Sequence, residues 1–162
     1  DHLTLLKSLN LIKNKINFHA IIMGSGILKD ELIKYIKKQN LSNCVKLISY
    51  KKNPYPFINQ ADLFILSSKY EGLPNVLLEA IALKKYVISS NCPSGPREIL
   101  LNGKGGGLFP IGDYKHLSKL ILLFKKNTIK NNASINLAYK KLNRFDLKKN
   151  LEKYYNEIID LM

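Results

Sequence analysis

The stretch "DLFILSSKYEGLPNVLLEAIALKKYVISS" (62–90) contains the unit that decides the fold of this chain. It opens with a short apolar run (62–66), passes through a loop of turn-forming residues, and enters a segment of helical character (75–84). A second apolar run (86–90) follows directly. Short apolar runs joined by a helix are typical of the strand–helix–strand units that build parallel sheets.

The same alternation extends over most of the 162 residues. Strands are predicted at 18–23, 44–48, 62–66, 86–90 and 107–111, and helices at 1–14, 27–39, 54–61, 75–84, 96–101 and 114–126. One or two further helices are predicted between 128 and 162, which has no strand signal. The pattern favours an α/β fold with a doubly wound parallel sheet, helices on both faces, and a ligand at the carboxyl ends of the strands. Because such a sheet normally opens with a strand, we expect one ahead of Asp1.

Composition is that of a single domain with a real core, since 46% of the residues are hydrophobic and 23% are charged. No apolar run reaches the roughly 18 to 20 residues that a membrane span requires, and no signal peptide is recognisable. The two cysteines, Cys44 and Cys92, lack C-x-x-C spacing. This cysteine usage predicts a reduced, cytoplasmic protein without a structural metal.

A formal net charge of +14 is compatible with nucleic acid, an anionic membrane or an anionic ligand. Arg97 and Arg144 are the only arginines among 26 basic residues, and no cluster of arginines and aromatic residues occurs. Nucleic-acid binding is therefore disfavoured. The simplest interpretation is a lysine excess spread over solvated faces. The second interpretation is weak attraction of the Lys-rich C-terminal third to the inner face of the membrane.

The start of the predicted helix 75–84 is a candidate anion site. Pro74 suits the first helical turn, where its missing N–H costs nothing. The amides of Leu73, Asn75 and Val76 should then point away from the helix at the end of strand 62–66. Helped by the helix dipole, such a site favours a diphosphate.

Two carboxylates flank this site. Glu79 lies inside a helix that reads as buried all round, and a buried, unpaired carboxylate needs hydrogen-bond donors. The neighbouring hydroxyls of a ribose would supply them, and Glu71 on the loop could hold hydroxyls at the other end of the ligand. Together the features indicate a nucleotide sugar. The alternative is that Glu79 favours the helix dipole and faces solvent, while Glu71 is an ordinary loop acid.

A second loop, "MGSG" (23–26), follows the strand 18–23, and its small residues would let backbone amides approach a ligand. A dinucleotide fingerprint would need a glycine where Lys29 stands and an acid within 44–50, and both are missing. An NAD site is thus disfavoured, and a tight structural turn remains the alternative.

A third loop is "NCPSGPREIL" (91–100), in which Gly95, Pro96 and Glu98 fit the N-cap, first and third positions of a new helix. Asp113 is predicted to cap the next helix. Arg97 is a candidate for contact with phosphate or with a neighbouring domain.

These stretches resemble a known family. "SSKYEGLPNVLLEAIALKKYVISSNCPSGPREIL" (67–100) and "NGKGGGLFPIGD" (102–113) closely resemble the donor-binding half of the retaining glycosyltransferases of family 4, also called glycosyltransferase group 1. The resemblance covers almost the whole chain, to about residue 155. It implies the C-terminal half of a GT-B fold, in which two Rossmann-like domains enclose the active site.

The resemblance also implies roles for individual residues. Glu71 looks like the catalytic-site glutamate at the donor sugar, and Glu79 looks like the one that binds ribose hydroxyls. The loop that contacts diphosphate and sugar corresponds to Gly72, Leu73, Pro74 and Asn75.

Two further groups correspond to the family's donor site. The glycines Gly24 and Gly26 resemble its G-x-G turn, while Tyr50 and Lys51 stand where the family lines the base pocket. The family's basic pair for the diphosphate and its N-terminal acceptor half have no counterpart in this chain. Residues 1–162 would then be a single nucleotide-sugar-binding domain, a fragment that lacks its first strand and is inactive alone.

The complete protein would transfer a hexose from a nucleotide diphosphate sugar, UDP-sugar being favoured, to an acceptor hydroxyl with retention at the anomeric carbon. The acceptor would be a cell-envelope glycan of the lipopolysaccharide or capsule type, and no metal cofactor is expected. Its partners would be the donor and the acceptor domain. Two alternatives remain: a non-catalytic or regulatory nucleotide-binding module, and a basic protein that binds RNA or membrane.

Overall fold

The computed structural model describes residues 1–161, in which strands and helices alternate up to residue 126 and only helices follow. The strands are β1 (Ala20–Met23), β2 (Val45–Ile48), β3 (Leu63–Leu66), β4 (Tyr86–Ser90) and β5 (Gly107–Phe109). The helices are α1 (His2–Ile12), α2 (Lys29–Lys38), α3 (Tyr55–Gln60), α4 (Asn75–Ala82), α5 (Pro96–Ile99), α6 (Tyr114–Lys126), α7 (Thr128–Lys140) and α8 (Leu147–Asp160), with short 3-10 turns η1 (Leu101–Gly103) and η2 (Leu142–Phe145). Every predicted element is present, and most are one to three residues shorter than predicted. The α/β class is therefore confirmed.

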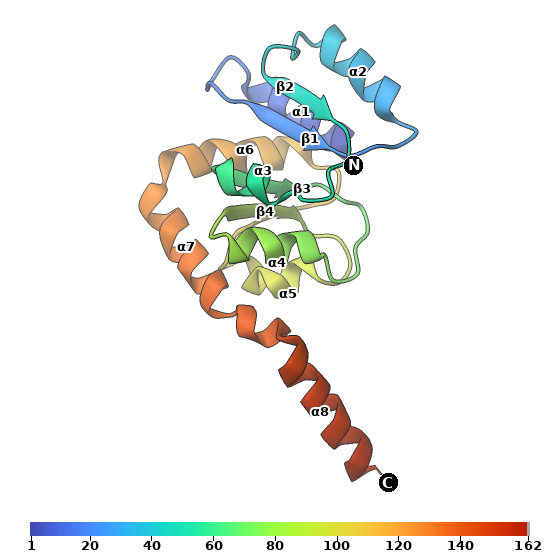
Figure 1. The fold of residues 1–162 in the computed structure, drawn as a ribbon. Helices are drawn as coiled ribbons and strands as arrows, with labels where there is room; N and C mark the ends of the chain where they lie inside the picture. Colours follow the sequence, from blue (N-terminus) through green and yellow to red (C-terminus); the bar gives the residue numbers. More distant parts are fainter. Residues whose placement is uncertain (162) are drawn as a thin grey trace.

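The strands form two parallel sheets where one continuous sheet was expected (Figure 1). In the first, β1 pairs with β2, with Ala20 opposite Val45. In the second, β4 lies between β3 and β5. Within the described part of the chain no backbone ladder joins the two sheets, so side chains have to connect them.

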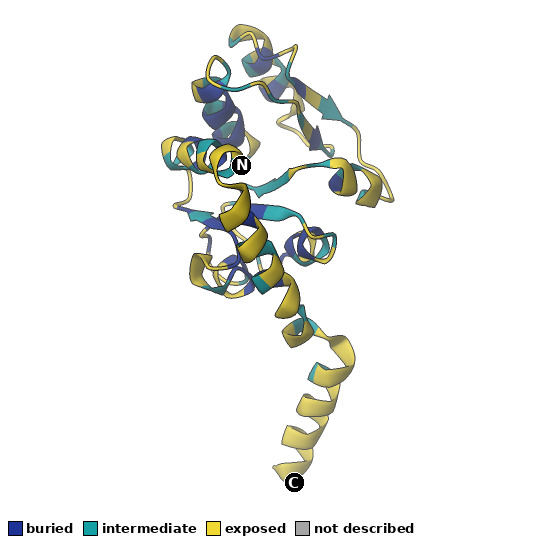
Figure 2. Cartoon of the chain, turned by 90° about the vertical axis from the view of Figure 1, so that its left-hand side faces the viewer, coloured by how far each residue is buried: buried dark blue, intermediate teal, exposed yellow. Residues whose placement is uncertain are grey.

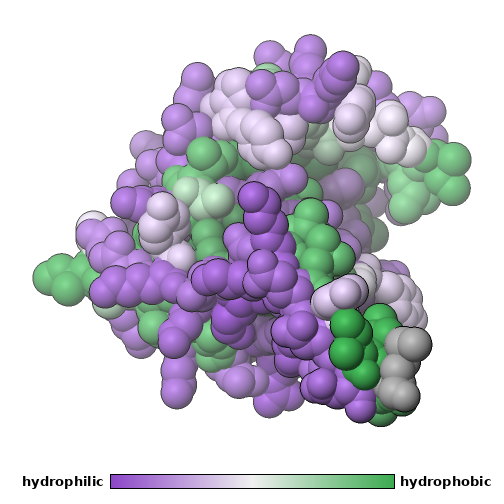
Figure 3. Space-filling view, turned by 60° about the horizontal axis from the view of Figure 1, so that its bottom comes forward, coloured by the Kyte–Doolittle hydropathy of each residue, from purple (hydrophilic) through white to green (hydrophobic). Residues whose placement is uncertain are grey.

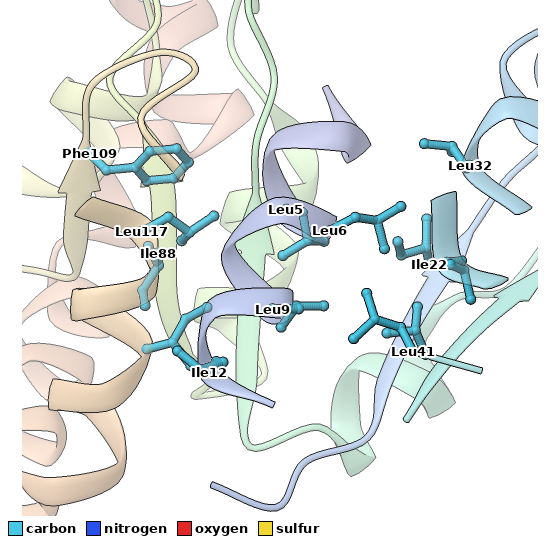
Figure 4. Packing of buried hydrophobic residues seen from close by; sticks show 13 residues of the cluster. Leu5, Leu6, Leu9, Ile12, Ile22, Leu32, Leu41, Ile88, Phe109 and Leu117 are labelled. Atoms are coloured by element: carbon cyan, nitrogen blue, oxygen red, sulfur yellow. The ribbon is translucent and has the colours of Figure 1, made fainter. Parts of the chain in front are cut away.

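Helix α1 makes that connection. Its buried side chains belong to one core cluster that includes residues of both sheets and of α2 and α6. The close-up in Figure 4 shows Leu6 reaching toward Ile22 of β1, while Ile12 reaches toward Ile88 of β4 and Leu117 of α6. Helix α1 can pack against both sheets because its apolar residues cover more than one narrow stripe of its surface.

The β3–β4–β5 sheet has helices on both faces, as predicted for a doubly wound arrangement. Consecutive residues of β4 point to opposite faces. Ile88 joins the cluster with α1 and α6, whereas Val87 joins a second cluster that contains Leu77 and Ile81 of α4. Both residues are fully buried, so the sheet is the middle layer of this part of the fold (Figure 2).

The last helix, α8, extends away from the rest of the chain, and every one of its residues except the half-buried Asn150 is exposed (Figures 1 and 2). An apolar face runs along it, and Figure 3 shows a hydrophobic patch at its free end. The exposed apolar residues are Leu147, Leu151, Tyr154, Tyr155, Ile158, Ile159 and Leu161. Over residues 1–161, no helix is both long enough and apolar enough to cross a membrane.

Candidate active site

The loops that follow β3 and β4 meet at the carboxyl edge of the second sheet. The hydroxyl of Ser90, at the end of β4, donates a hydrogen bond to the carbonyl oxygen of Ser68 at 2.6 Å. A few residues further on, Gly95 abuts the β3 loop so closely that a Cβ there would overlap the carbonyl oxygen of Gly72 and the Cδ of Pro74. The 67–74 loop, with Glu71 on it, is thus fixed against the 91–95 loop.

Helix α4 begins directly after this loop, with Pro74 as its N-cap and without a side-chain cap. Pro74 was predicted inside the first turn of the helix, whereas it lies at the N-cap, just before that turn. The first bond at this helix end is donated by Leu77 to the carbonyl oxygen of Pro74, at 2.9 Å. The amides of Asn75 and Val76 have no backbone acceptor in the described chain, and both residues are exposed. A helix end of this kind can bind an anion.

Glu79 is partly buried, and the prediction of a helix buried all round is wrong. Only Leu77, Ala80 and Ile81 of α4 are buried, because a single face of the helix packs on the sheet, while Val76 on another face is 38% exposed. Desolvation of the carboxylate is thus milder than the sequence suggested. Among residues 1–161 its hydrogen-bond partner is the Tyr55 hydroxyl, which lies 3.5 Å from Oε1, at the limit of a hydrogen bond.

Tyr55 is a candidate site residue that the sequence did not predict. It opens α3, where its amide donates to the side chain of Asn53 at 3.1 Å. Its ring is 47% exposed. An exposed tyrosine next to two prolines, in "NPYPF" (53–57), was the available signal, but only the packing of α3 beside α4 brings its hydroxyl to Glu79.

Glu71 is partly buried and forms no ion pair within the described residues. Both of its oxygens therefore remain available to accept hydrogen bonds from a ligand. Neighbouring Gly72 and Leu73 are exposed on the same loop, with Leu73 49% exposed. The loop thus presents one carboxylate and one apolar side chain to its surroundings.

The remaining predicted residues lie in loops of the other sheet. Gly24 and Gly26 follow β1, and the space around both glycines is open. Tyr50 and Lys51 follow β2, both exposed, with the tyrosine 70% exposed. The amide of Gly24 donates a hydrogen bond to the carbonyl oxygen of Ile48, the last residue of β2, at 2.9 Å. The two loops therefore start side by side. No recorded hydrogen bond links them to the 67–74 loop in the part of the chain described.

A cavity of about 690 Å³ adjoins the 91–95 loop, which forms part of its wall together with Arg97, Glu98, Asn102 and Ile111. The predicted caps are confirmed here, since Gly95 is the N-cap of α5, Pro96 opens that helix, and Asp113 caps α6 through a 2.8 Å bond to the His116 amide. Arg97 donates from Nε to the side chain of Asn102 at 2.9 Å, so one of its donors is engaged within the protein.

No group of three or more metal-ligating side chains occurs between residues 1 and 161. What the arrangement can do is bind an anionic, hydroxyl-rich molecule. Two free helix-end amides can hold phosphate oxygens, and two carboxylates on either side of them can accept hydrogen bonds from hydroxyl groups.

Comparison with known proteins gives a family and a fold. The family described as glycosyl transferases group 1 matches residues 1–141. An uncharacterized glycosyltransferase of Methanocaldococcus jannaschii is 44% identical over 97 residues, which are 59% of this chain and 24% of that protein.

A second relative is the N-acetylgalactosamine-N,N'-diacetylbacillosaminyl-diphospho-undecaprenol 4-alpha-N-acetylgalactosaminyltransferase of Campylobacter jejuni. It is 32% identical over 111 residues, 68% of this chain and 30% of its own length. The chain therefore spans only about a quarter to a third of these relatives. The crystal structure of Anabaena HepE with UDP superposes with a TM-score of 0.86 at 22% identity, covering 99% of this chain and 45% of HepE, which establishes the fold.

Proposed function

This chain belongs to the group 1 glycosyl transferases, and from that premise we propose that it is the C-terminal, donor-binding domain of a retaining GT-B glycosyltransferase. Its donor is a nucleotide diphosphate sugar, with UDP-hexose as the leading candidate. The acceptor is a hydroxyl group of a cell-envelope glycan. The UDP in the HepE crystal supports the choice of donor. The name of the Campylobacter relative includes a diphospho-undecaprenol-linked sugar, which supports the choice of acceptor.

The observation that carries the proposal is the start of α4 with its two carboxylates. The free amides of Asn75 and Val76 donate hydrogen bonds to the diphosphate, where the positive end of the helix dipole adds to the attraction. Glu79, one turn further along, accepts hydrogen bonds from the ribose hydroxyls, and Glu71 accepts them from the sugar. The hydroxyl of Tyr55 helps to orient Glu79.

The chemical step breaks the bond between the anomeric carbon and the diphosphate oxygen, and the electron pair stays on the diphosphate. The acceptor oxygen loses its proton and bonds to the anomeric carbon on the same face. Negative charge grows on the departing diphosphate, so donors that already point at it stabilise the transition state more than the ground state. We propose that the amides at the start of α4, together with a basic pair outside residues 1–162, provide this stabilisation without a metal ion. Activity should then persist in excess EDTA.

Calorimetric titration of UDP and UDP-sugars into the chain tests the donor site, with GDP- and ADP-sugars for comparison. Glu79→Gln removes the charge of one hydrogen-bond acceptor, and a hydrogen bond to a charged group contributes about 1.5–3 kcal/mol. We expect UDP to bind roughly 10- to 150-fold more weakly, and inorganic diphosphate, which has no ribose, to bind as before. Glu152→Gln on the exposed helix α8 is the matched control. Equal UDP affinity in wild type and Glu79→Gln would remove Glu79 from the site.

The catalytic role of Glu71 is tested in the complete polypeptide that carries these residues. Glu71→Ala should abolish sugar transfer while UDP still binds, because the diphosphate contacts belong to α4. Unchanged turnover in this variant would contradict the role proposed for Glu71. The second candidate, a non-catalytic nucleotide-binding module, is favoured instead if UDP binds tightly and the complete polypeptide transfers none of the sugars offered.

A further inference from the structure

The 91–95 loop controls where the neighbouring 67–74 loop sits, and the two loops touch at a crowded point. Gly95 has a φ of +60°, and the preceding Ser94 has a φ of +65° although it is not a glycine. Left-handed backbone at a serine is uncommon and persists where the surrounding structure holds it in place. At Gly95 the two backbones approach so closely that no side chain fits between them.

A second point of attachment lies a few residues away. Ser90 is completely buried, and its hydroxyl donates to the carbonyl oxygen of Ser68 at 2.6 Å. The loop is therefore held at Ser68 by a hydrogen bond and at Gly72 by close packing. Glu71 lies between these two points, one residue before Gly72, and the first amide of α4, that of Asn75, follows four residues after Glu71.

We propose that Ser90 and Gly95 are positioning residues for sugar transfer, which keep Glu71 in register with the first amides of α4 without touching the donor. This inference rests on the function proposed above. Reacting groups must be held to within about 0.5 Å, and a displacement of about 1 Å can cost on the order of 100-fold in rate. An alanine at Gly95 can be accommodated only if the two loops separate.

Two variants probe the two attachment points. Gly95→Ala displaces the loop at Gly72, and Ser90→Ala removes the bond to Ser68. For both we expect kcat to fall by at least about tenfold, within the range that misplacement produces. For Ser90→Ala the Kd for UDP should change by less than about threefold, because α4 and Glu79 are fixed independently by the packing of Leu77, Ala80 and Ile81. Gly95→Ala also presses on Pro74, the N-cap of α4, so its effect on UDP binding is not used to judge the proposal.

Gly112→Ala is a matched control for the first variant. Gly112 has a φ of +75°, so alanine meets the same kind of backbone strain there, but nothing lies within 4 Å of its added Cβ. Gly112→Ala should therefore lose stability without losing kcat. Urea unfolding and hydrogen exchange of residues 68–74, measured on all three variants, separate loss of folding from displacement. Faster exchange in that loop is expected only for Gly95→Ala and Ser90→Ala.

The outcomes separate this inference from the proposed function. If the wild-type polypeptide transfers sugar and Gly95→Ala and Ser90→Ala both keep kcat within about threefold of Gly112→Ala, the positioning role is wrong and the function stands. A loss of UDP affinity in proportion to kcat in Ser90→Ala also refutes it, since Ser90 then acts on binding. If the wild type neither binds UDP nor transfers sugar, both fail. Should Gly95→Ala not fold, Ser90→Ala alone decides.

Discussion

Replacing Leu6 by alanine tests whether α1 holds the two sheets together. Leu6 is completely buried in the cluster that joins β1, β4 and α6. The substitution removes three carbon atoms, which at about 0.8 kcal/mol each gives a transfer term of about 2.4 kcal/mol, and the cavity raises the total to about 3–4 kcal/mol. For a domain of this size, that corresponds to a fall in Tm of roughly 10 °C.

Urea unfolding followed by circular dichroism measures the loss, with Leu11→Ala as control. Leu11 lies on the same helix and is 41% exposed, so its truncation should cost about 1 kcal/mol. Hydrogen exchange should show β1 and β2 opening more readily in Leu6→Ala, because the described strands of that sheet reach the second sheet through α1. If Leu6→Ala loses no more stability than Leu11→Ala, α1 is not the element that joins the sheets.

Further predictions concern caps, thiols and lipid. The side chains of Asp113 and Asp146 each cap a helix by accepting a hydrogen bond from a backbone N–H. Because α6 is packed and α8 is exposed, Asp113→Ala should lower the free energy of unfolding by about 1 kcal/mol and Asp146→Ala should only fray α8. Burial raises the pKa of the Cys44 thiol. The reaction of Cys44 with iodoacetamide should therefore have a higher pH midpoint in the folded chain than in urea. The contribution of this thiol to the free energy of unfolding should be fully present below the pKa of the unfolded state and should be lost as pH rises through the pKa of the folded state. We also propose weak lipid attachment through the C-terminal third, so sedimentation with anionic vesicles should occur at low salt and disappear at high salt.

The alternation of strands and helices was predictable because short apolar runs and helical periodicity are local signals. Turn chemistry was predictable for the same reason, as the caps at Gly95 and Asp113 show. The division into two sheets was not, since pairing between strands is a tertiary property. That α1 packs between the sheets likewise depends on which of its apolar side chains face which layer.

The candidate site was predictable in its position and less so in its environment. The loop 71–76 lies at a helix start as expected, because Pro74 and the preceding strand are local signals. The burial of Glu79 was overestimated, since apolar residues such as Val76 can remain exposed and the sequence alone does not show which face of α4 packs. Tyr55 and the contact between Gly95 and Gly72 were missed because both join segments distant in the chain.

The packing of α1 against α6 has a consequence for synthesis. Residues 13–113 separate these helices along the chain, yet the two share one core. In a growing polypeptide, the part of α1 that packs against α6 stays exposed until α6 has emerged from the ribosome. Nascent chains that stop short of α6 should accordingly be prone to aggregation, sensitive to proteases and dependent on chaperones. Chains that stop just before α8 should already be able to fold.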